Sequence, residues 1–350
     1  GAAMLTIHQI NPASASVELT GLWNRTFGDD PASIYAFYRQ FSNHMDVLVQ
    51  ADERERIVSA AHFLPVGYHY FHSEWKGSYL YAAMTDESVR GQGLMSRLMR
   101  LRMQKGASEG EFFLCTLPAE AELYDYYARF GMVPLFALHR ATMTRRQLAE
   151  RKLTLCFESK ASPSFAYAST YARREFTVVK DKRFIDYTAY DNEMAGGVFG
   201  SVYAGYYFAR PLGEGSVYVK ELFLHGDNFP HFAAALLRRF PKADSFVFDF
   251  CPGECPGGVD YIEVQAGCAR LLDVAGALKS YAARHRDLSM SFFLQDPVIE
   301  NNTGAYFLQG GMVKRAEQRG ELSPMSVEEL TRLLMTDGGR GVPYMNMMLD

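Results

Sequence analysis

The sequence has few cysteines and no long apolar run. Five cysteines among 350 residues form an odd, scattered set that does not have the pattern of a disulfide framework. Cys251 and Cys255 alone fall short of a four-ligand zinc shell, so no metal is expected. No apolar segment is long enough to cross a bilayer, and residues 1–4 lack the basic-then-apolar pattern of a signal peptide. The sequence therefore predicts no membrane span and a cytoplasmic location.

An excess of basic charge is also missing. The chain has 36 basic and 40 acidic residues, a net charge of −4, which argues against nucleic acid as a partner. Hydrophobic residues make up 48% and charged residues 22%, as in ordinary globular proteins, and 350 residues suffice for two or three domains. The 21 tyrosines and 25 phenylalanines favour sheets with broad apolar surfaces over long helical bundles.

One stretch combines a short apolar strand, a glycine loop and a helix. Residues 79–84 are apolar and aromatic, as in a buried strand, and from residue 94 apolar positions recur at helical spacing up to Gly106. Between them, Gly91 and Gly93 can adopt backbone angles closed to other residues and present no side chain. Free amide groups and the positive end of a helix dipole then favour an anion, most often a phosphate.

The loop does not match the two commonest phosphate-binding motifs. The third glycine of the dinucleotide fingerprint is absent, and no Gly-Lys-Ser/Thr of a Walker loop is present. An ordinary strand, turn and helix is the alternative interpretation. Arg90, Gly93 and Met95, however, occupy the places of the motif Arg/Gln-x-x-Gly-x-Gly/Ala. In this the sequence resembles the GNAT family of N-acetyltransferases, with Met95 as a departure from the motif.

The resemblance implies a set of residues that bind acetyl-CoA as co-substrate. The amide groups of the loop would hold the pyrophosphate, and the end of the strand would hold the pantetheine and the thioester carbonyl. The residues concerned are Met84, Thr85, Arg90, Gly91, Gln92, Gly93, Leu94, Met95 and Ser96.

A second resemblance lies at Tyr127, four residues before Gly131. The helix predicted over residues 123–130 ends at this glycine, as in the family pattern Tyr-x-x-x-Gly. A phenol with a pKa of about 10 stays protonated at pH 7 and can donate a proton to a departing thiolate. The resemblance implies that Tyr127 is this general acid, and Tyr124 and Tyr126 remain alternatives.

The first two predicted helices, at residues 17–26 and 31–42, form a wall of the acceptor cleft in proteins of this kind. Their aromatic residues are either acceptor contacts or core. Histidines on or near the predicted strand at residues 57–70 are expected at the surface or lining the cleft, not as metal ligands. The residues concerned are Trp23, Phe27, Tyr35 and Tyr38 on the helices, and His62, His69 and His72 on the strand.

The remaining chain does not repeat the Arg-x-x-Gly pattern, so no second cofactor site is expected. Strands at residues 200–207 and 216–223, a helix at 229–240 and a strand at 245–250 nonetheless follow the order of the second half of an acetyltransferase domain. Residues 145–152 are predicted to be an exposed, charged connector. A helix at residues 269–283 is predicted next.

This order resembles acetyltransferases of the enhanced-intracellular-survival type. The resemblance implies an α/β (α+β) fold with an active domain at residues 1–147, a degenerate acetyltransferase-like domain at 148–265 and a small sterol-carrier-like α+β domain at 266–350. A capping box at Ser326 and Glu329 opens the last predicted helix. Relatives of this architecture associate, and the aromatic surface would permit a homo-oligomer.

The C-terminal segment, residues 342–350, is apolar where a disordered tail would be polar. It is expected to pack against the protein. In the family that the chain resembles, the terminal carboxylate helps to deprotonate the acceptor amine, so Asp350 is a candidate catalytic residue. The alternative is a tail that only closes the fold.

The function predicted from the resemblance is transfer of an acetyl group from acetyl-CoA to a primary amine by direct attack in a ternary complex. The acceptor is a small molecule or a lysine side chain. The alternative is a non-catalytic sensor or scaffold that binds acetyl-CoA or a lipid. Acidic residues near the cleft would favour a cationic acceptor, namely Asp29, Asp30, Glu120, Asp125 and Asp350.

Overall fold

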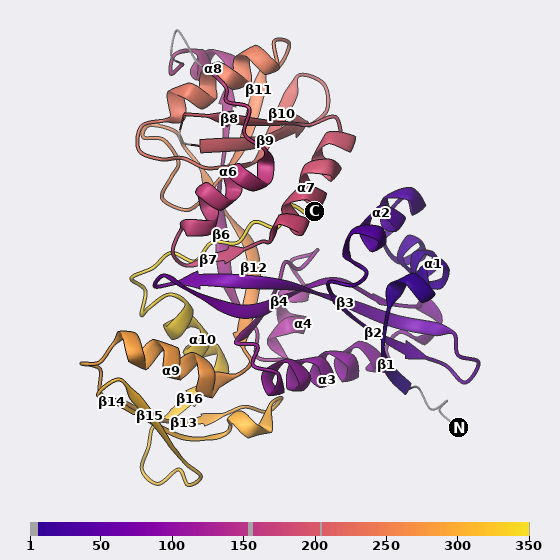
Figure 1. The fold of residues 1–350 in the computed structure, drawn as a ribbon, viewed down its shortest axis with the longest axis vertical. Helices are drawn as coiled ribbons and strands as arrows, with labels where there is room; N and C mark the ends of the chain where they lie inside the picture. Colours follow the sequence, from indigo (N-terminus) through magenta and orange to yellow (C-terminus); the bar gives the residue numbers. More distant parts are fainter. Residues whose placement is uncertain (1–5, 153–156, 204, 350) are drawn as a thin grey trace. The chain divides into compact units, whose positions relative to one another are not determined.

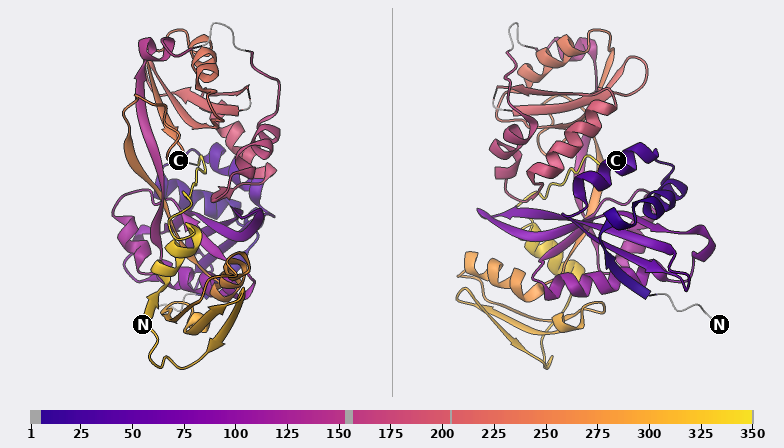
Figure 2. Two further views of the ribbon diagram at one scale, coloured as in Figure 1. Left: turned by 90° about the vertical axis from the view of Figure 1, so that its left-hand side faces the viewer. Right: turned by 45° about the vertical axis from the view of Figure 1, so that its right-hand side comes forward.

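The computed structural model describes residues 6–152, 157–203 and 205–349. The chain forms two compact units (Figures 1 and 2). We call residues 1–135 and 267–341 the first domain, and residues 136–266 and 342–350 the second domain. Both are built from helices and mixed sheets, which confirms the predicted α/β class. The division into three domains stays a prediction, since the structure groups residues 267–341 with the first domain.

The first domain contains a mixed sheet whose strands are ordered β1-β2-β3-β4-β5-β12. Strands β1 to β4 are antiparallel, whereas β4 and β5 run parallel, which requires a crossover helix between them. The bounds are β1 (Thr6–Ile10), β2 (Asp46–Ala51), β3 (Ile57–Tyr70), β4 (Ser73–Thr85), β5 (Phe113–Thr116) and β12 (Ile262–Leu271), of which residues 268–271 pair with β5.

Helices cover both faces of this sheet (Figure 1). Helices α1 (Ser16–Phe27) and α2 (Pro31–Phe41) lie on one face, and α3 (Leu94–Ser108) and α4 (Leu123–Ala128) lie on the other. The predicted end of α3 at Gly106 is wrong, because the helix continues to Ser108. A Cβ at Gly106 would lie 3.1 Å from Leu272 Cδ1, so this glycine permits close packing inside the helix.

The C-terminal part of the first domain adds a four-stranded sheet, ordered β15-β14-β13-β16. The capping box of Ser326 and Glu329 at the last helix is confirmed. The predicted helix at residues 269–283 begins later, because residues 269–271 belong to β12. The bounds are α9 (Val274–Arg284), β13 (Met290–Gln295), β14 (Gly304–Gln309), β15 (Met312–Ala316), β16 (Pro324–Ser326) and α10 (Val327–Met335).

The second domain is built on a sheet ordered β6-β11-β10-β9-β8. Strands β10 and β11 run parallel on either side of α8 (Phe229–Arg239) in sequence, which repeats the β4-α3-β5 arrangement of the first domain. The strands are β6 (Val133–Thr144), β8 (Val198–Val202), β9 (Gly205–Pro211), β10 (Ser216–Leu222) and β11 (Ser245–Phe250), with β7 (Thr177–Val179) outside this order.

Two predictions for the second domain are wrong. The strand predicted at residues 200–207 is split between β8 and β9, and the predicted connector at residues 145–152 begins with a helix. That helix has a capping box formed by Thr144 and Gln147, and it buries Leu148 completely. The helices are α5 (Arg145–Ala149), α6 (Pro163–Ser169), α7 (Lys182–Met194) and α8 (Phe229–Arg239), and 3₁₀ helices occur at η1 (Pro12–Ser14), η2 (Glu87–Val89), η3 (Tyr171–Arg173) and η4 (Glu300–Asn302).

The C-terminal segment packs, as the sequence predicted. Tyr344 is 2% exposed and pairs with Thr177 in a parallel bridge to β7. Its ring stacks on Tyr171 with 5.1 Å between the centroids. Across the described ranges, no helix has the length and apolarity needed to span a membrane.

Candidate active site

The loop between β4 and α3 has two glycines with left-handed backbone angles. Gly91 has φ +80° and Gly93 has φ +73°, a region that costs other residues strain. A Cβ built at either position would meet no atom within 4 Å, so the space beside both glycines is open. The two positions therefore favour glycine because of their backbone angles, and not because neighbouring atoms leave no room for a side chain.

The N-terminus of α3 is uncapped. Gly93 is the N-cap residue and supplies no side-chain hydrogen bond, and the first turn contains no acidic residue. The amide groups of Leu94, Met95 and Ser96 therefore have no intrahelical acceptor, and the positive end of the helix dipole lies at the same place. An open, glycine-flanked helix N-terminus of this kind can bind a phosphate group.

Asp86 and Arg90 hold the start of the loop. The amide of Ser88 donates to Asp86 Oδ1 at 3.0 Å, and Asp86 Oδ2 pairs with Arg25 at 3.2 Å. The hydrogen bonds from Ser88, with a smaller effect of Arg25, lower the pKa of this carboxyl. Arg90 Nε donates to the carbonyl oxygen of Thr85 at 3.0 Å. These contacts fix the path of the chain from β4 into the glycine loop.

A β-bulge interrupts β4 two residues before Met84. Ala82 has φ +49°, and the pairing with β3 shifts register at this point. His62 Nδ1 lies 3.2 Å from the Tyr81 carbonyl oxygen and 3.1 Å from that of Ala82. Because carbonyl oxygens only accept, Nδ1 carries the proton and Nε2 accepts from the Tyr38 hydroxyl at 2.8 Å. The bulge is thus held by a side chain from the neighbouring strand.

The sequence did not predict this role. His62 was expected at the surface or in the cleft, but it is fully buried, and that prediction is wrong. Burial lowers its pKa to about 4, so the imidazole is neutral at neutral pH. The only hint of this buried role in the sequence is that His62 stands among apolar residues of the strand. Met84 is also buried, whereas Thr85 is partly exposed, so any ligand contact of Met84 is through its backbone.

The aromatic residues of α1 and α2 divide into two groups. Trp23 is 3% exposed, and its ring lies 5.2 Å from His62. Tyr38 is equally buried, so both belong to the core that supports the bulge. Phe27 and Tyr35 are 45% and 39% exposed and remain accessible to a ligand.

Tyr127 lies in α4 and packs into the core on the α3 face of the sheet. Its neighbours in this cluster include Leu98, Met99 and Cys268, and the residue is 7% exposed. Burial raises the pKa of Tyr127 far above its ordinary value, with smaller contributions from Cys268 and Tyr126. The hydroxyl therefore keeps its proton throughout the neutral range and can act only as a donor or a neutral acceptor.

The two neighbouring tyrosines have other partners. The amide of Gly267 donates to the Tyr124 hydroxyl at 3.0 Å, and burial raises the pKa of Tyr124 to about 12. Burial also raises the pKa of Tyr126, while a hydrogen bond from Ser96 opposes that shift. Tyr126 thereby links α4 to the first turn of α3. Which of the three tyrosines is the acid stays a prediction.

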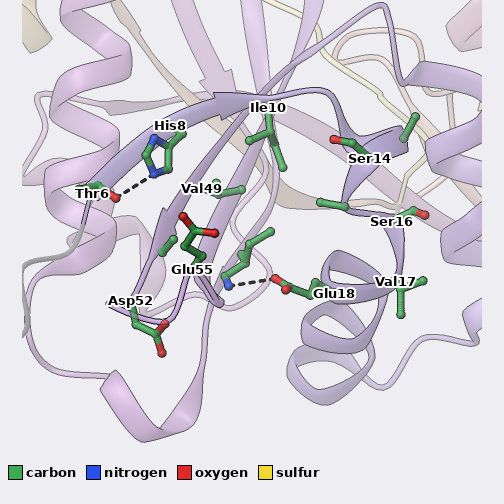
Figure 3. A pocket seen from close by; sticks show the side chains of 14 residues that line it. Thr6, His8, Ile10, Ser14, Ser16, Val17, Glu18, Val49, Asp52 and Glu55 are labelled. Carbon is green, nitrogen blue, oxygen red and sulfur yellow. Dashed lines mark hydrogen bonds between the residues drawn. The ribbon is translucent and has the colours of Figure 1, made fainter.

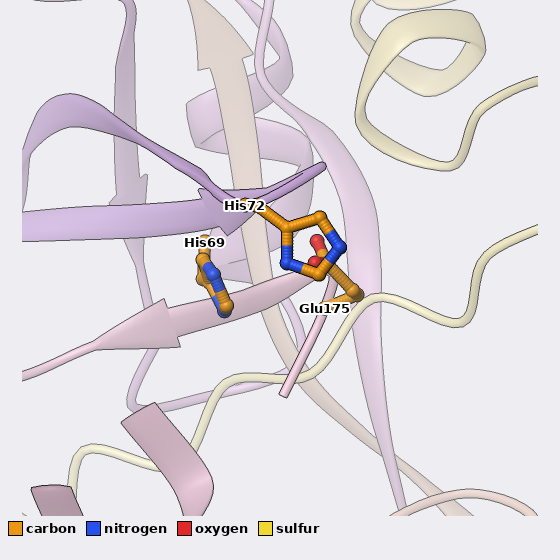
Figure 4. A group of neighbouring side chains, drawn as sticks. All are labelled: His69, His72 and Glu175. Atoms are coloured by element: carbon orange, nitrogen blue, oxygen red, sulfur yellow. The ribbon is translucent and has the colours of Figure 1, made fainter. Parts of the chain in front are cut away.

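Other features of the first domain lie apart from these residues. A cleft of about 660 Å³ lies between β1, β2 and the start of α1 (Figure 3). Here Glu18 accepts from the Ile57 amide at 3.0 Å. None of residues 84–96 lines it. His69 lies near the end of β3 and His72 in the turn that leads to β4 (Figure 4), and their ring centroids are 6.4 Å apart. Both are at least partly exposed, as predicted.

The corresponding loop of the second domain, between β10 and α8, contains a buried asparagine side chain that bonds to backbone groups. Asn228, the N-cap residue of α8, is 2% exposed. Its Oδ1 accepts from the His225 amide at 2.9 Å, and its Nδ2 donates to the Tyr203 carbonyl at 3.2 Å. Pro230 in the first turn has no amide hydrogen. Where α3 begins with an open glycine, α8 begins with a buried, bonded asparagine.

Asp350, the second catalytic residue predicted from the sequence, lies outside the described residues, as does Cys156. The structure therefore gives no position for the terminal carboxylate. Residues 344–348 precede it and are described.

Comparisons with known proteins give one family match and several structural matches. Residues 10–134 match the family model described as an acetyltransferase (GNAT) domain. A search of curated proteins found no match. The fold is similar to a probable N-acyltransferase of unknown function from Enterococcus faecalis, with a TM-score of 0.79, 14% identity and coverage of 95% of this chain and 90% of that one.

Two further solved structures have the same fold over nearly the whole chain. A GCN5-related N-acetyltransferase from Kribbella flavida has a TM-score of 0.77 and 15% identity, with 98% of each chain covered. Eis1 from Mycobacterium abscessus has a TM-score of 0.73 and 14% identity, with 95% of this chain and 89% of that one covered. At these identities the likeness is one of fold.

Proposed function

We propose that this protein, whose residues 10–134 match the family model of an acetyltransferase (GNAT) domain, transfers an acetyl group from acetyl-CoA to a primary amine. The open, uncapped N-terminus of α3 after the glycine loop is the observation that carries the proposal. The amides from Arg90 to Ser96 would bind the pyrophosphate. Thr85, together with the backbone of Met84, would hold the pantetheine and the thioester carbonyl.

The reaction proceeds by direct attack in a ternary complex. The neutral amine attacks the thioester carbon, a C–N bond forms, and the tetrahedral intermediate collapses with cleavage of the C–S bond. Tyr127 donates a proton to the leaving sulfur, because its phenol is protonated at neutral pH. Asp350 would take the proton that the amine loses, and no metal is needed.

The acceptor in this proposal is a cationic small molecule or a lysine side chain. Exposed aromatic rings of Phe27 and Tyr35 would contact its apolar part, and the exposed carboxylates of Glu120 and Asp125 would attract its charge. Two other acidic residues already have structural partners. Asp29 accepts from the Trp23 indole, and Asp30 caps α2.

Four further predictions belong to this proposal. They are a cytoplasmic location, a homo-oligomeric state, a sterol-carrier-like character of residues 266–350, and a degenerate acetyltransferase character of residues 148–265. The buried Asn228 side chain, which stands where the first domain has Gly93, supports the last of these.

Tyr127→Phe tests the chemistry with little change in packing. The release of free thiol from acetyl-CoA would be followed with a panel of polyamines, aminoglycosides and lysine peptides. The variant is expected to lose about 10²-fold or more in kcat, the usual contribution of a general acid, while the Kd for acetyl-CoA stays constant. Tyr124→Phe is the matched control, since its hydroxyl bonds to the backbone of β12.

Two results would refute parts of the proposal. Unchanged turnover in Tyr127→Phe together with a loss in Tyr124→Phe or Tyr126→Phe would move the acid to another tyrosine. Acetyl-CoA binding without thiol release for any amine would favour the sensor or scaffold.

A further inference from the structure

The C-terminal segment is bound by the second domain through its backbone. The Tyr344 amide donates to the Phe176 carbonyl at 2.8 Å, and the Val178 amide donates to the Tyr344 carbonyl at 2.9 Å. The segment therefore lies beside β7 as an added strand. These bonds alone would hold any sequence, because backbone groups carry no side-chain specificity.

A buried lysine binds the C-terminal segment two residues after Tyr344. The Lys180 ammonium donates to the Asn346 carbonyl at 2.7 Å and lies 3.4 Å from Glu221 Oε2. The side chains of Lys180 and Glu221 are each 1% exposed, and Lys180 lies over the ring of Tyr167 at 5.3 Å. Two buried charges are costly unless they are paired and hydrogen-bonded, so the Asn346 carbonyl completes this site.

The segment also occupies a particular place on the sheet. The pairing of β9 with β10 shifts register between Val219 and Glu221, which leaves Lys220 in a bulge just after the last parallel pair of β10 and β11. Asn346 Nδ2 donates to the Lys220 carbonyl at 2.7 Å. In the first domain, the bulge at Ala82 likewise follows the parallel pairing of β4 with β5.

We propose that the second domain binds the C-terminal segment of its own chain at the bulge of β10, and that Lys180 is the positioning residue that fixes this segment and thereby Asp350. The segment takes the place on β10 that corresponds to the bulged end of β4 in the first domain. In this proposal the second domain is a docking domain for the chain terminus. The role of Asp350 rests on the proposed function, whereas the docking does not.

Hydrogen exchange of the full-length chain tests the docking. Lys180→Met combined with Glu221→Gln removes the ammonium without leaving an unpaired buried carboxylate. Exchange at the Tyr344 and Val178 amides is expected to accelerate at least tenfold, while that of α8 stays constant. Lys182→Met is the matched control, because Lys182 is 75% exposed in the next helix. Unchanged protection of the Tyr344 amide in the double variant would overturn the proposal.

Kinetics test the positioning. The double variant is expected to lose at least tenfold in kcat at saturating amine with an unchanged Kd for acetyl-CoA, and deletion of Asp350 is expected to produce a similar loss. Combining both changes should produce no further loss, because Lys180 acts through Asp350. Additive losses, or an unchanged kcat despite faster exchange, would overturn the positioning role. If the wild-type chain acetylates no amine, the proposed function fails while hydrogen exchange still decides the docking.

Discussion

Replacing Gly93 by alanine separates the role of the glycine loop in folding from its role in binding. At φ +73° an alanine costs about 1–2 kcal/mol of backbone strain. The lower entropy of the unfolded alanine chain offsets part of this, by about 0.4–1 kcal/mol. We therefore expect the free energy of unfolding to fall by about 1 kcal/mol, since a Cβ at this position meets no atom within 4 Å.

The effect on acetyl-CoA should be larger. The new methyl group would lie in the open space beside the first-turn amides of α3, where the pyrophosphate is proposed to approach. Loss of one hydrogen bond to a charged group costs about 1.5–3 kcal/mol, which corresponds to a Kd about 10-fold to 150-fold higher. Titration calorimetry with acetyl-CoA measures this change, and urea unfolding measures the stability of the same sample.

Gly110→Ala is the matched control at the other end of the same helix. Gly110 has φ +84°, and a Cβ there also meets no atom within 4 Å. The stability loss should match that of Gly93→Ala, with an unchanged Kd. If both variants weaken acetyl-CoA binding equally, or if Gly93→Ala leaves the Kd within twofold of the wild type, the proposed phosphate site is refuted.

Two other predictions concern buried charge in the first domain. Asp296→Ala leaves the fully buried Arg270 guanidinium without its carboxylate, so urea unfolding should show a loss of about 3–5 kcal/mol, and a loss under 1 kcal/mol would contradict this. His62 has a pKa of about 4 when folded, below its unfolded value near 6.5, so the unfolded state binds more protons between these pH values. The free energy of unfolding should therefore fall by up to about 3 kcal/mol as the pH drops from 6.5 to 4. In His62→Gln, urea unfolding measured across that range should no longer show this pH dependence. An equal pH dependence in both proteins would exclude His62 as its source.

Local chemistry made several features predictable from the sequence. Asp30 before Pro31 marks the start of α2, and the capping box at Ser326 predicted that of α10, because caps involve residues only two or three positions apart. The glycine loop was predictable for the same reason, since φ angles open to Gly91 and Gly93 depend on these residues alone.

Long-range pairing was not predictable in this way. One neighbour of β5 is the end of β12, where Cys268 pairs with Thr116, 268 − 116 = 152 residues earlier in the chain. Residues 269–271 were therefore expected in a helix, whose apolar pattern they also fit. Similarly, α3 continues past Gly106 to Ser108, whereas a glycine near the last apolar position otherwise indicates a helix end.

The sequence by itself determined where backbone amides stay free and which segments are apolar. Only the tertiary structure decided that His62 holds the bulge of β4. It also decided that Lys180 binds the C-terminal segment at Asn346, which is 166 residues away in the sequence. Both are buried polar groups, and such a group is stable only when distant chain segments supply its hydrogen-bond partners. The sequence shows which residue is polar, but only the folded chain shows which groups form its hydrogen bonds.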